Sequence, residues 1–146
     1  MKSLFKLYLL LFLVLFSGAA RADELHGLQI MDSTPVVCNI STAMTWTNTL
    51  GVNIRVHQVR SWIGLDYNTK ADLAMTVWAP GGNIINQTAF DRYANPAGSV
   101  EESRIIEPGV VVPAGQDITA GYFCTKVATT SAHAQFAVTI WYTIEP

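Results

Sequence analysis

Apolar and other residues alternate with a period of two through most of this chain, and this pattern limits its possible folds more than any other feature. Near the C-terminus, every second residue from Phe136 to Ile144 is apolar or aromatic. Successive side chains of a β-strand point to opposite faces of the sheet, so such alternation predicts strands with one buried face. Beyond position 22, no stretch of a dozen residues has the periodicity of a helix. We therefore predict an all-β protein.

The same reasoning predicts nine strands separated by turns that are rich in proline, glycine and asparagine. The expected strands are 36–41, 43–48, 52–65, 72–79, 84–93, 99–106, 109–112, 118–127 and 134–144, with turns at 80–83, 95–98, 108–109 and 113–115. Short strands at this spacing indicate a two-sheet antiparallel β-sandwich. The strand count favours a jelly roll over an immunoglobulin-like Greek key.

The expected strand 52–65 changes phase halfway along. Its apolar residues occupy even positions up to Val56 and odd positions from Val59 onward. One extra residue in a strand reverses the faces of all residues that follow. The change therefore predicts a β-bulge or a bend near His57 and Gln58.

The first 22 residues have the composition of a secretory signal peptide. Lys2 and Lys6 precede an apolar run over 7–16, and small residues follow up to Ala22. The run is shorter than the roughly 20 apolar residues that a membrane-spanning helix needs. We expect a signal peptide at 1–22 and a single β-sandwich domain at 23–146, secreted or placed in the periplasm or extracellular space, with no integral membrane span after signal removal.

The charge of the expected mature chain argues against nucleic acid as a partner. Removal of residues 1–22 takes away three of the nine basic residues and none of the eleven acidic ones, which leaves a net charge of −5. A phosphate-binding surface needs clustered Lys and Arg. The six remaining basic residues are scattered singly, at Arg55, Arg60, Lys70, Arg92, Arg104 and Lys126.

The chain has two cysteines, Cys38 and Cys124. An even number of cysteines in an exported chain most simply forms intramolecular disulfides, so we predict one bridge between them. Two free buried thiols and intermolecular bonding are the alternatives. A metal pair is disfavoured because no other Cys or His lies within a few residues of either one.

Three of the four tryptophans are predicted on outward strand faces. Alternation places Trp78 and Trp141 away from the core, and beyond the phase change Trp62 shares the polar side of its strand with Arg60. An indole presented on a flat sheet stacks on sugar rings or is buried by a partner surface. These four residues are the candidate binding or interface residues, with ordinary packing as the alternative; Trp46 is assigned to the core.

The sequence contains no catalytic or metal-binding motif. His26, His57 and His133 are isolated from other zinc ligands, and there is no Gly-x-Ser-x-Gly elbow. The turn at 66–68 carries oxygen-bearing side chains but lacks the spacing of a dedicated calcium loop. We expect no catalytic residue, no cofactor and no metal. Carboxylates that could form a hydrolase pair are as numerous as in any sandwich of this size: Asp66, Asp91, Glu101, Glu102 and Glu107.

Two asparagines, Asn39 and Asn86, match the N-glycosylation acceptor pattern. Pilus subunits, the exported disulfide-linked β-sandwiches of fimbriae, are similar to this chain in the alternating C-terminal strand that includes Tyr142. The two cysteines of those proteins lie much closer together than Cys38 and Cys124. We therefore do not assign the chain to that family.

These observations support three hypotheses of different classes. The first is an exported, non-catalytic β-sandwich module that recognises a carbohydrate or a protein surface through an aromatic patch. The second is a structural or assembly subunit of a homo-oligomer, whose outward tryptophans are buried against neighbouring copies. The third is a small secreted hydrolase.

The signal-peptide assignment makes a direct prediction. The small residues up to Ala22 fit cleavage by signal peptidase, so the exported protein should begin at Asp23 or within two residues of it. N-terminal sequencing of exported material measures this start. Exported protein that retains Met1 would contradict the assignment.

Overall fold

The computed structural model describes residues 24–33, 36–37, 40–65, 71–91, 98–126 and 133–146. Regular structure in these ranges is almost entirely β. The elements are β1 (His26–Asp32), β2 (Val36–Val37), β3 (Ile40–Thr47), β4 (Ile54–Leu65), β5 (Ala71–Ala79), the short 3-10 turn η1 (Pro80–Gly82), β6 (Asn83–Asp91), β7 (Ser99–Val112), β8 (Asp117–Lys126) and β9 (His133–Ile144).

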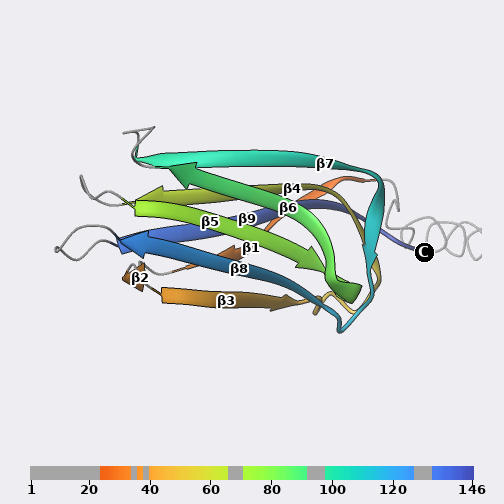
Figure 1. Cartoon of the computed structure of the whole chain (residues 1–146). Coiled ribbons are helices and arrows are strands. Elements are labelled where there is room, and N and C mark those ends of the chain that lie inside the picture. Colours follow the sequence, from red (N-terminus) through yellow and green to blue (C-terminus); the bar gives the residue numbers. More distant parts are fainter. Residues whose placement is uncertain (1–23, 34–35, 38–39, 66–70, 92–97, 127–132) are drawn as a thin grey trace, which may run out of the picture.

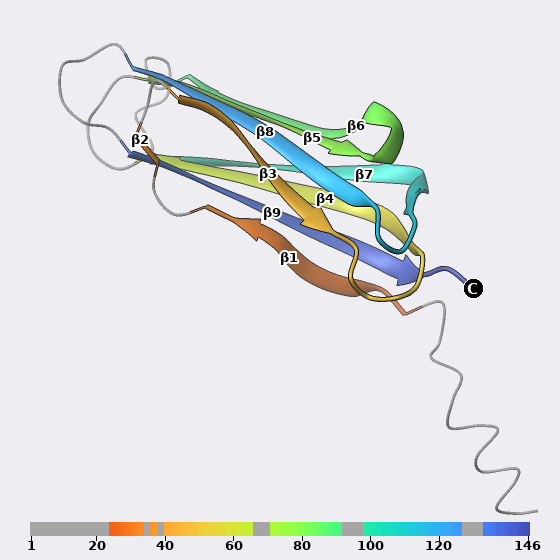
Figure 2. The same ribbon diagram turned by 90° about the horizontal axis from the view of Figure 1, so that it is seen from below.

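The strands form two sheets that are stacked face to face (Figures 1 and 2). Sheet A has the order β1-β9-β4-β7, with the short strand β2 beside β9. Sheet B has the order β3-β8-β5-β6. The prediction of an all-β, two-sheet antiparallel sandwich is confirmed.

The pairing of the strands is that of a jelly roll. Strand β1 pairs with β9, β3 with β8, β4 with β7, and β5 with β6, all antiparallel. These pairs are nested along the chain, as if one long hairpin were folded at its middle and then rolled into two layers. The preference for a jelly roll over an immunoglobulin-like Greek key is confirmed.

The core lies between the sheets and is built by the predicted alternation. In β9, Phe136, Val138 and Ile140 are fully buried, whereas the residues between them are half-buried on the outer face. Tyr122 of β8 stacks on Phe136 with ring centroids 4.0 Å apart, and burial raises the pKa of the Tyr122 hydroxyl. Trp46 packs against this core from β3, as expected.

The predicted phase change in β4 is a β-bulge. The pairing of β4 with both β7 and β9 shifts register between Val56 and Gln58. Val56 is buried before the bulge, and Val59 is buried after it. One bulge therefore keeps both halves of a twelve-residue strand on the core, and it sends the residues that follow Val59 at even positions outward.

The bounds of two predicted strands and one predicted turn are corrected, and one strand was not predicted. The expected strands 36–41 and 43–48 are instead β2 and β3, and β1 was not predicted, because its sequence HGLQIMD has weak alternation.

The expected turn at 108–109 is wrong, since these residues lie inside β7. Ile105 pairs with Gln58, and Val110 pairs with Val56, so the intervening residues bulge out of the ladder. Gly109 has a φ of +95°, and a Cβ there would approach the Val56 oxygen to 3.0 Å, which explains a glycine at this position.

The predicted disulfide and signal peptide fall partly or wholly outside the described residues. Cys124 is 2% exposed on the inner face of β8 and is paired in register with Ile40, two residues after Cys38 in the sequence. Cys38 and residues 1–22 are not described, so the bridge and the cleavage site stay predictions. In the described part of the chain, no helix is long and apolar enough to cross a membrane.

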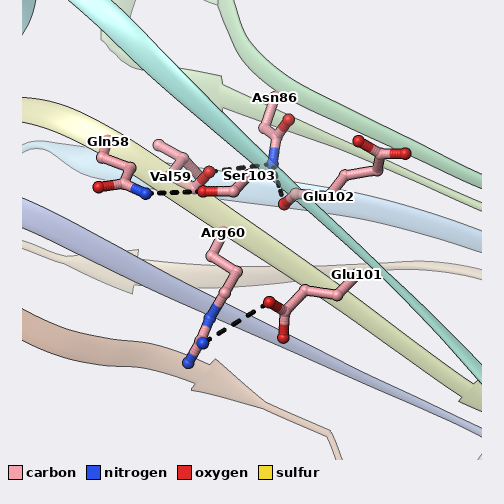
Figure 3. Close-up of polar contacts among 7 residues, drawn as sticks. All are labelled: Gln58, Val59, Arg60, Asn86, Glu101, Glu102 and Ser103. Atoms are coloured by element: carbon pink, nitrogen blue, oxygen red, sulfur yellow. Dashed lines mark hydrogen bonds and ion pairs between the residues drawn. The ribbon is translucent and has the colours of Figure 1, made fainter.

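A buried asparagine on β6 connects the two sheets. Asn86 is 2% exposed, and its Nδ2 donates to the Ser61 hydroxyl at 2.8 Å. The same nitrogen donates to the main-chain oxygens of Val59 and Glu102 at 3.3 and 3.2 Å (Figure 3). Its own oxygen accepts from the amide of Gln87 at 2.9 Å. An amide so enclosed is not accessible to glycosylation in the folded protein; Asn39 lies outside the described residues.

Replacement of Asn86 by alanine should destabilise the fold. The change leaves the Ser61 hydroxyl without this bond and removes a link between sheets, so the free energy of unfolding should fall by about 2–4 kcal/mol. Chemical denaturation measures the loss. Asn83→Ala on the same strand is the control, because that side chain is exposed and makes one long bond, at 3.4 Å, to the Pro80 oxygen. Equal stabilities of the two variants would contradict this role of Asn86.

Candidate functional site

The three outward tryptophans lie on two opposite faces of the sandwich. Trp62 of β4 and Trp141 of β9 are half-buried on the outer face of sheet A, and Trp78 of β5 is half-buried on the outer face of sheet B. The outward orientations follow the predicted alternation. The structure does not gather the three indoles into one patch, because β4 and β9 belong to sheet A and β5 belongs to sheet B. The sequence could not show this separation, since the assignment of strands to sheets is not encoded in local periodicity.

Each of these indoles lies across a glycine. A Cβ built on Gly64 would overlap the ring of Trp62, one on Gly121 would lie 2.8 Å from the ring of Trp78, and one on Gly27 would lie 3.1 Å from Nε1 of Trp141. Glycine therefore leaves room for each ring against the sheet, where a side chain would crowd it.

Arg60 joins the two tryptophans of sheet A. Its guanidinium lies over the ring of Trp141, 5.3 Å from the centroid, which is the geometry of a cation–π contact. Its Nη1 is 3.7 Å from Oε1 of Glu101 on β7 (Figure 3). Glu101 is in turn the direct cross-strand partner of Trp62. Successive contacts therefore connect Trp141 to Arg60, Arg60 to Glu101, and Glu101 to Trp62. We call these four residues the Trp62 surface.

The charged members of the Trp62 surface remain accessible. The side chains of Arg60 and Glu101 are 42% and 49% exposed, so their 3.7 Å ion pair is well solvated and contributes little to stability. The guanidinium retains donors, and the carboxylate retains acceptors, that an incoming ligand can use. Sequence reasoning singled out Arg60 but treated Glu101 as an ordinary carboxylate, because the β4–β7 pairing that brings them together is non-local.

Polar contacts extend the face toward the other end of β4. Gln58 Nε2 donates to the Ser103 hydroxyl at 2.7 Å (Figure 3), and the His57 ring nitrogen lies 2.9 Å from the Thr143 hydroxyl. At the end of the strand, Arg55 donates to Glu145, and this hydrogen bond raises the pKa of Arg55 and lowers that of Glu145. The outer face of sheet A is thus polar and ordered around the two indoles.

The outer face of sheet B has a different character. Trp78 is paired in register with Ile84 of β6, which is 46% exposed. The ring of Trp78 lies against Gly121 of β8, and Phe123, two residues further along the same face, is 43% exposed. These residues form an apolar strip across β6, β5 and β8, which we call the Trp78 strip.

In the described part of the chain, no group of three or more His, Cys, Asp or Glu side chains is arranged to hold a metal ion. The His57 ring nitrogen lies within hydrogen-bonding distance of the Thr143 hydroxyl. The predicted turn at 66–68 lies outside the described residues.

No protein-family model matches the chain, and no curated protein matches it in sequence. Among solved structures, a disulfide-linked pilus protein of Bacillus endospore appendages has 11% identity and a TM-score of 0.45, over 88% of this chain and 97% of its own. The CBM36-1 domain of a multidomain xylanase from the hindgut metagenome of Trinervitermes trinervoides has 10% identity and a TM-score of 0.37, over 80% and 96%. The BFDV capsid protein has 8% identity and a TM-score of 0.39, over 84% and 95%. Similarity at this level carries no argument about function.

The glycine beneath Trp62 should control the position of that ring. Gly64→Ala introduces a methyl group where the indole now lies, so the ring should be displaced from the sheet. The 19F NMR spectrum of protein labelled with 5-fluorotryptophan should then show one shifted indole resonance, that of Trp62. Thr45→Ala, at an exposed outward position of β3, is the control. An unchanged Trp62 resonance in Gly64→Ala would contradict the stacked arrangement.

Proposed function

We propose that this protein is an exported, non-catalytic β-sandwich module that binds a carbohydrate on the Trp62 surface. The observation that carries the proposal is the placement of a flat, half-buried indole directly beside an exposed Arg–Glu pair. This combination offers an apolar platform and charged hydrogen-bonding groups that are close enough together to contact the same sugar ring. Sugars have the matching chemistry, with an apolar C–H face and hydroxyl groups around the rim.

Trp62 is the platform in this proposal. Its inner ring face is covered by Gly64, and in the described part of the chain neither an aromatic ring nor a cation lies over the other face. A sugar that stacks there would therefore not have to displace a stacked ring or cation of the described residues. The ring is also held in place before binding, which lowers the entropic cost of ordering it with the ligand.

Arg60 and Glu101 supply the polar contacts. A guanidinium donates several hydrogen bonds in a fixed plane, and a carboxylate accepts them, so together they can bind adjacent hydroxyl groups. Trp141 acts on the ligand through Arg60, because its ring lies against the guanidinium at 5.3 Å and limits its motion. Trp141 is therefore a positioning residue rather than a second platform.

Trp62→Ala and Trp78→Ala form a matched pair that tests the proposal. Both changes remove a half-buried indole that covers a glycine, so both should lower stability to a similar extent. Trp62→Ala alone should abolish glycan binding, because stacking on an aromatic platform contributes most of the affinity at such a site. Binding is measured by a glycan array with the purified protein, followed by calorimetry with the best-bound sugar. An array without any bound glycan, or equal binding by the two variants, would contradict the proposal.

A second candidate function is an assembly subunit, which the exposed apolar residues of the Trp78 strip favour. Phe123 and Ile84 present apolar surface on a face that also carries Trp78, and such surface is typical of interfaces between subunits. Sedimentation of Phe123→Ser beside the unmodified protein separates this candidate from the first. Dissociation of an oligomer by this change, with glycan binding absent, would favour assembly over carbohydrate recognition.

A further inference from the structure

The strand β7 is an open edge of sheet A. It pairs with β4 on one side, and in the described part of the chain no strand pairs with its other side; Figure 1 shows it along the margin of the molecule. Residues 101–105 are all exposed, and Ile105 is 70% exposed. An exposed edge with unpaired main-chain groups is a template for pairing with another strand.

The contacts of Asn86 show which main-chain groups of β7 face outward. Its Nδ2 lies 3.3 Å from the oxygen of Val59 on β4 and 3.2 Å from the oxygen of Glu102 on β7 (Figure 3). One nitrogen can contact both oxygens only if both carbonyls point into the space between the two strands. Main-chain groups alternate in direction along an antiparallel pair, so those of the odd-numbered residues in 101–105 point to the open edge.

We propose that β7 pairs antiparallel with β7 of a second copy of this chain, about a two-fold axis at Ser103. The odd-numbered residues, whose main-chain groups face outward, then form the hydrogen-bonded pairs of a new ladder. Ser103 meets Ser103 of the partner subunit, and Glu101 lies opposite Ile105 of the partner subunit. This inference is independent of the glycan proposal.

Charge complementarity selects this register. In it, Glu102 of each copy lies opposite Arg104 of the other, twice by symmetry. These are non-hydrogen-bonded pairs, in which the side chains of facing residues come closest. Opposite charges that face each other at such positions stabilise a strand pair, and like charges destabilise it.

The neighbouring two-fold registers are less favourable. A two-fold axis at Glu101 or Glu102 brings two glutamates face to face, and an axis at Arg104 brings two arginines face to face. An axis at Ile105 avoids like charges but leaves Glu102 opposite Pro108 and without a basic partner. Among axes at positions 101–105, only the one at Ser103 places acidic residues opposite basic ones.

The dimer would also align two copies of the Trp62 surface. A two-fold axis that relates antiparallel edge strands is perpendicular to the sheet, so both outer faces of sheet A lie on the same side. From strand spacing and rise, the two Trp62 residues would be roughly 20 Å apart. If the glycan proposal holds, one extended glycan or surface could be bound at two sites at once.

Charge exchange on β7 tests the dimer. Glu102→Arg and Arg104→Glu should each replace attraction with repulsion and raise the dimer dissociation constant at least about tenfold. The double variant E102R/R104E restores opposite charges and should return the constant to near that of the unmodified protein. Sedimentation velocity of the exported protein, from micromolar to millimolar concentration, measures this, since strand-edge interfaces are small. Asp117→Lys, an exposed charge reversal on β8, is the control and should leave the dimer unchanged.

Ser103→Pro tests the main-chain ladder separately. Proline removes a donor that points to the open edge and not to β4, so the variant should stay folded and become monomeric. Thermal unfolding monitored by near-UV circular dichroism verifies its fold. An unmodified protein that is monomeric throughout the range overturns the proposal. So does a dimer that persists in both single charge variants, or one that the double variant fails to restore.

Discussion

The β-bulge at Val56 to Gln58 is the feature on which the outer surface of sheet A depends. Strand β4 lies in the centre of that sheet, between β9 and β7. A strand of this length without a bulge would keep one phase, and the residues after Val56 would exchange faces. Val59 and Ile63 would then leave the core, and Arg60 and Trp62 would enter it. One extra residue therefore satisfies the core and exposes the candidate ligand-binding side chains.

The buried amide of Asn86 is the second constraint, because it acts on both sheets. It belongs to the edge strand of sheet B, yet it bonds to β4 and β7 of sheet A. A buried amide without hydrogen-bond partners costs free energy, so arrangements of the two sheets that would leave Asn86 unsatisfied are less stable. The β4–β7 register that these bonds support also places Glu101 beside Trp62.

Each outward tryptophan packs against a glycine of its own sheet while its side chain remains on the outer face. A glycine beside each indole leaves room for the ring against the sheet. In the proposed function, the same placement makes the Trp62 ring available to a ligand. Trp62 and Trp78 share this local arrangement and differ in their neighbours, which are Arg60 and Glu101 for the one, and Ile84 and Phe123 for the other.

Local alternation in the sequence was sufficient for the all-β class, most strands, the bulge in β4 and the outward direction of three tryptophans, because side-chain direction in a strand is set by its immediate neighbours. It did not predict β1, whose alternation is weak. It also wrongly predicted a turn at Pro108 and Gly109, which instead lie in a bulge inside β7. The sheet to which each strand belongs was decided by tertiary pairing. The separation of Trp78 from Trp62, the approach of Glu101 to Arg60 and the bonds of Asn86 all join residues distant in sequence, and no local pattern records them.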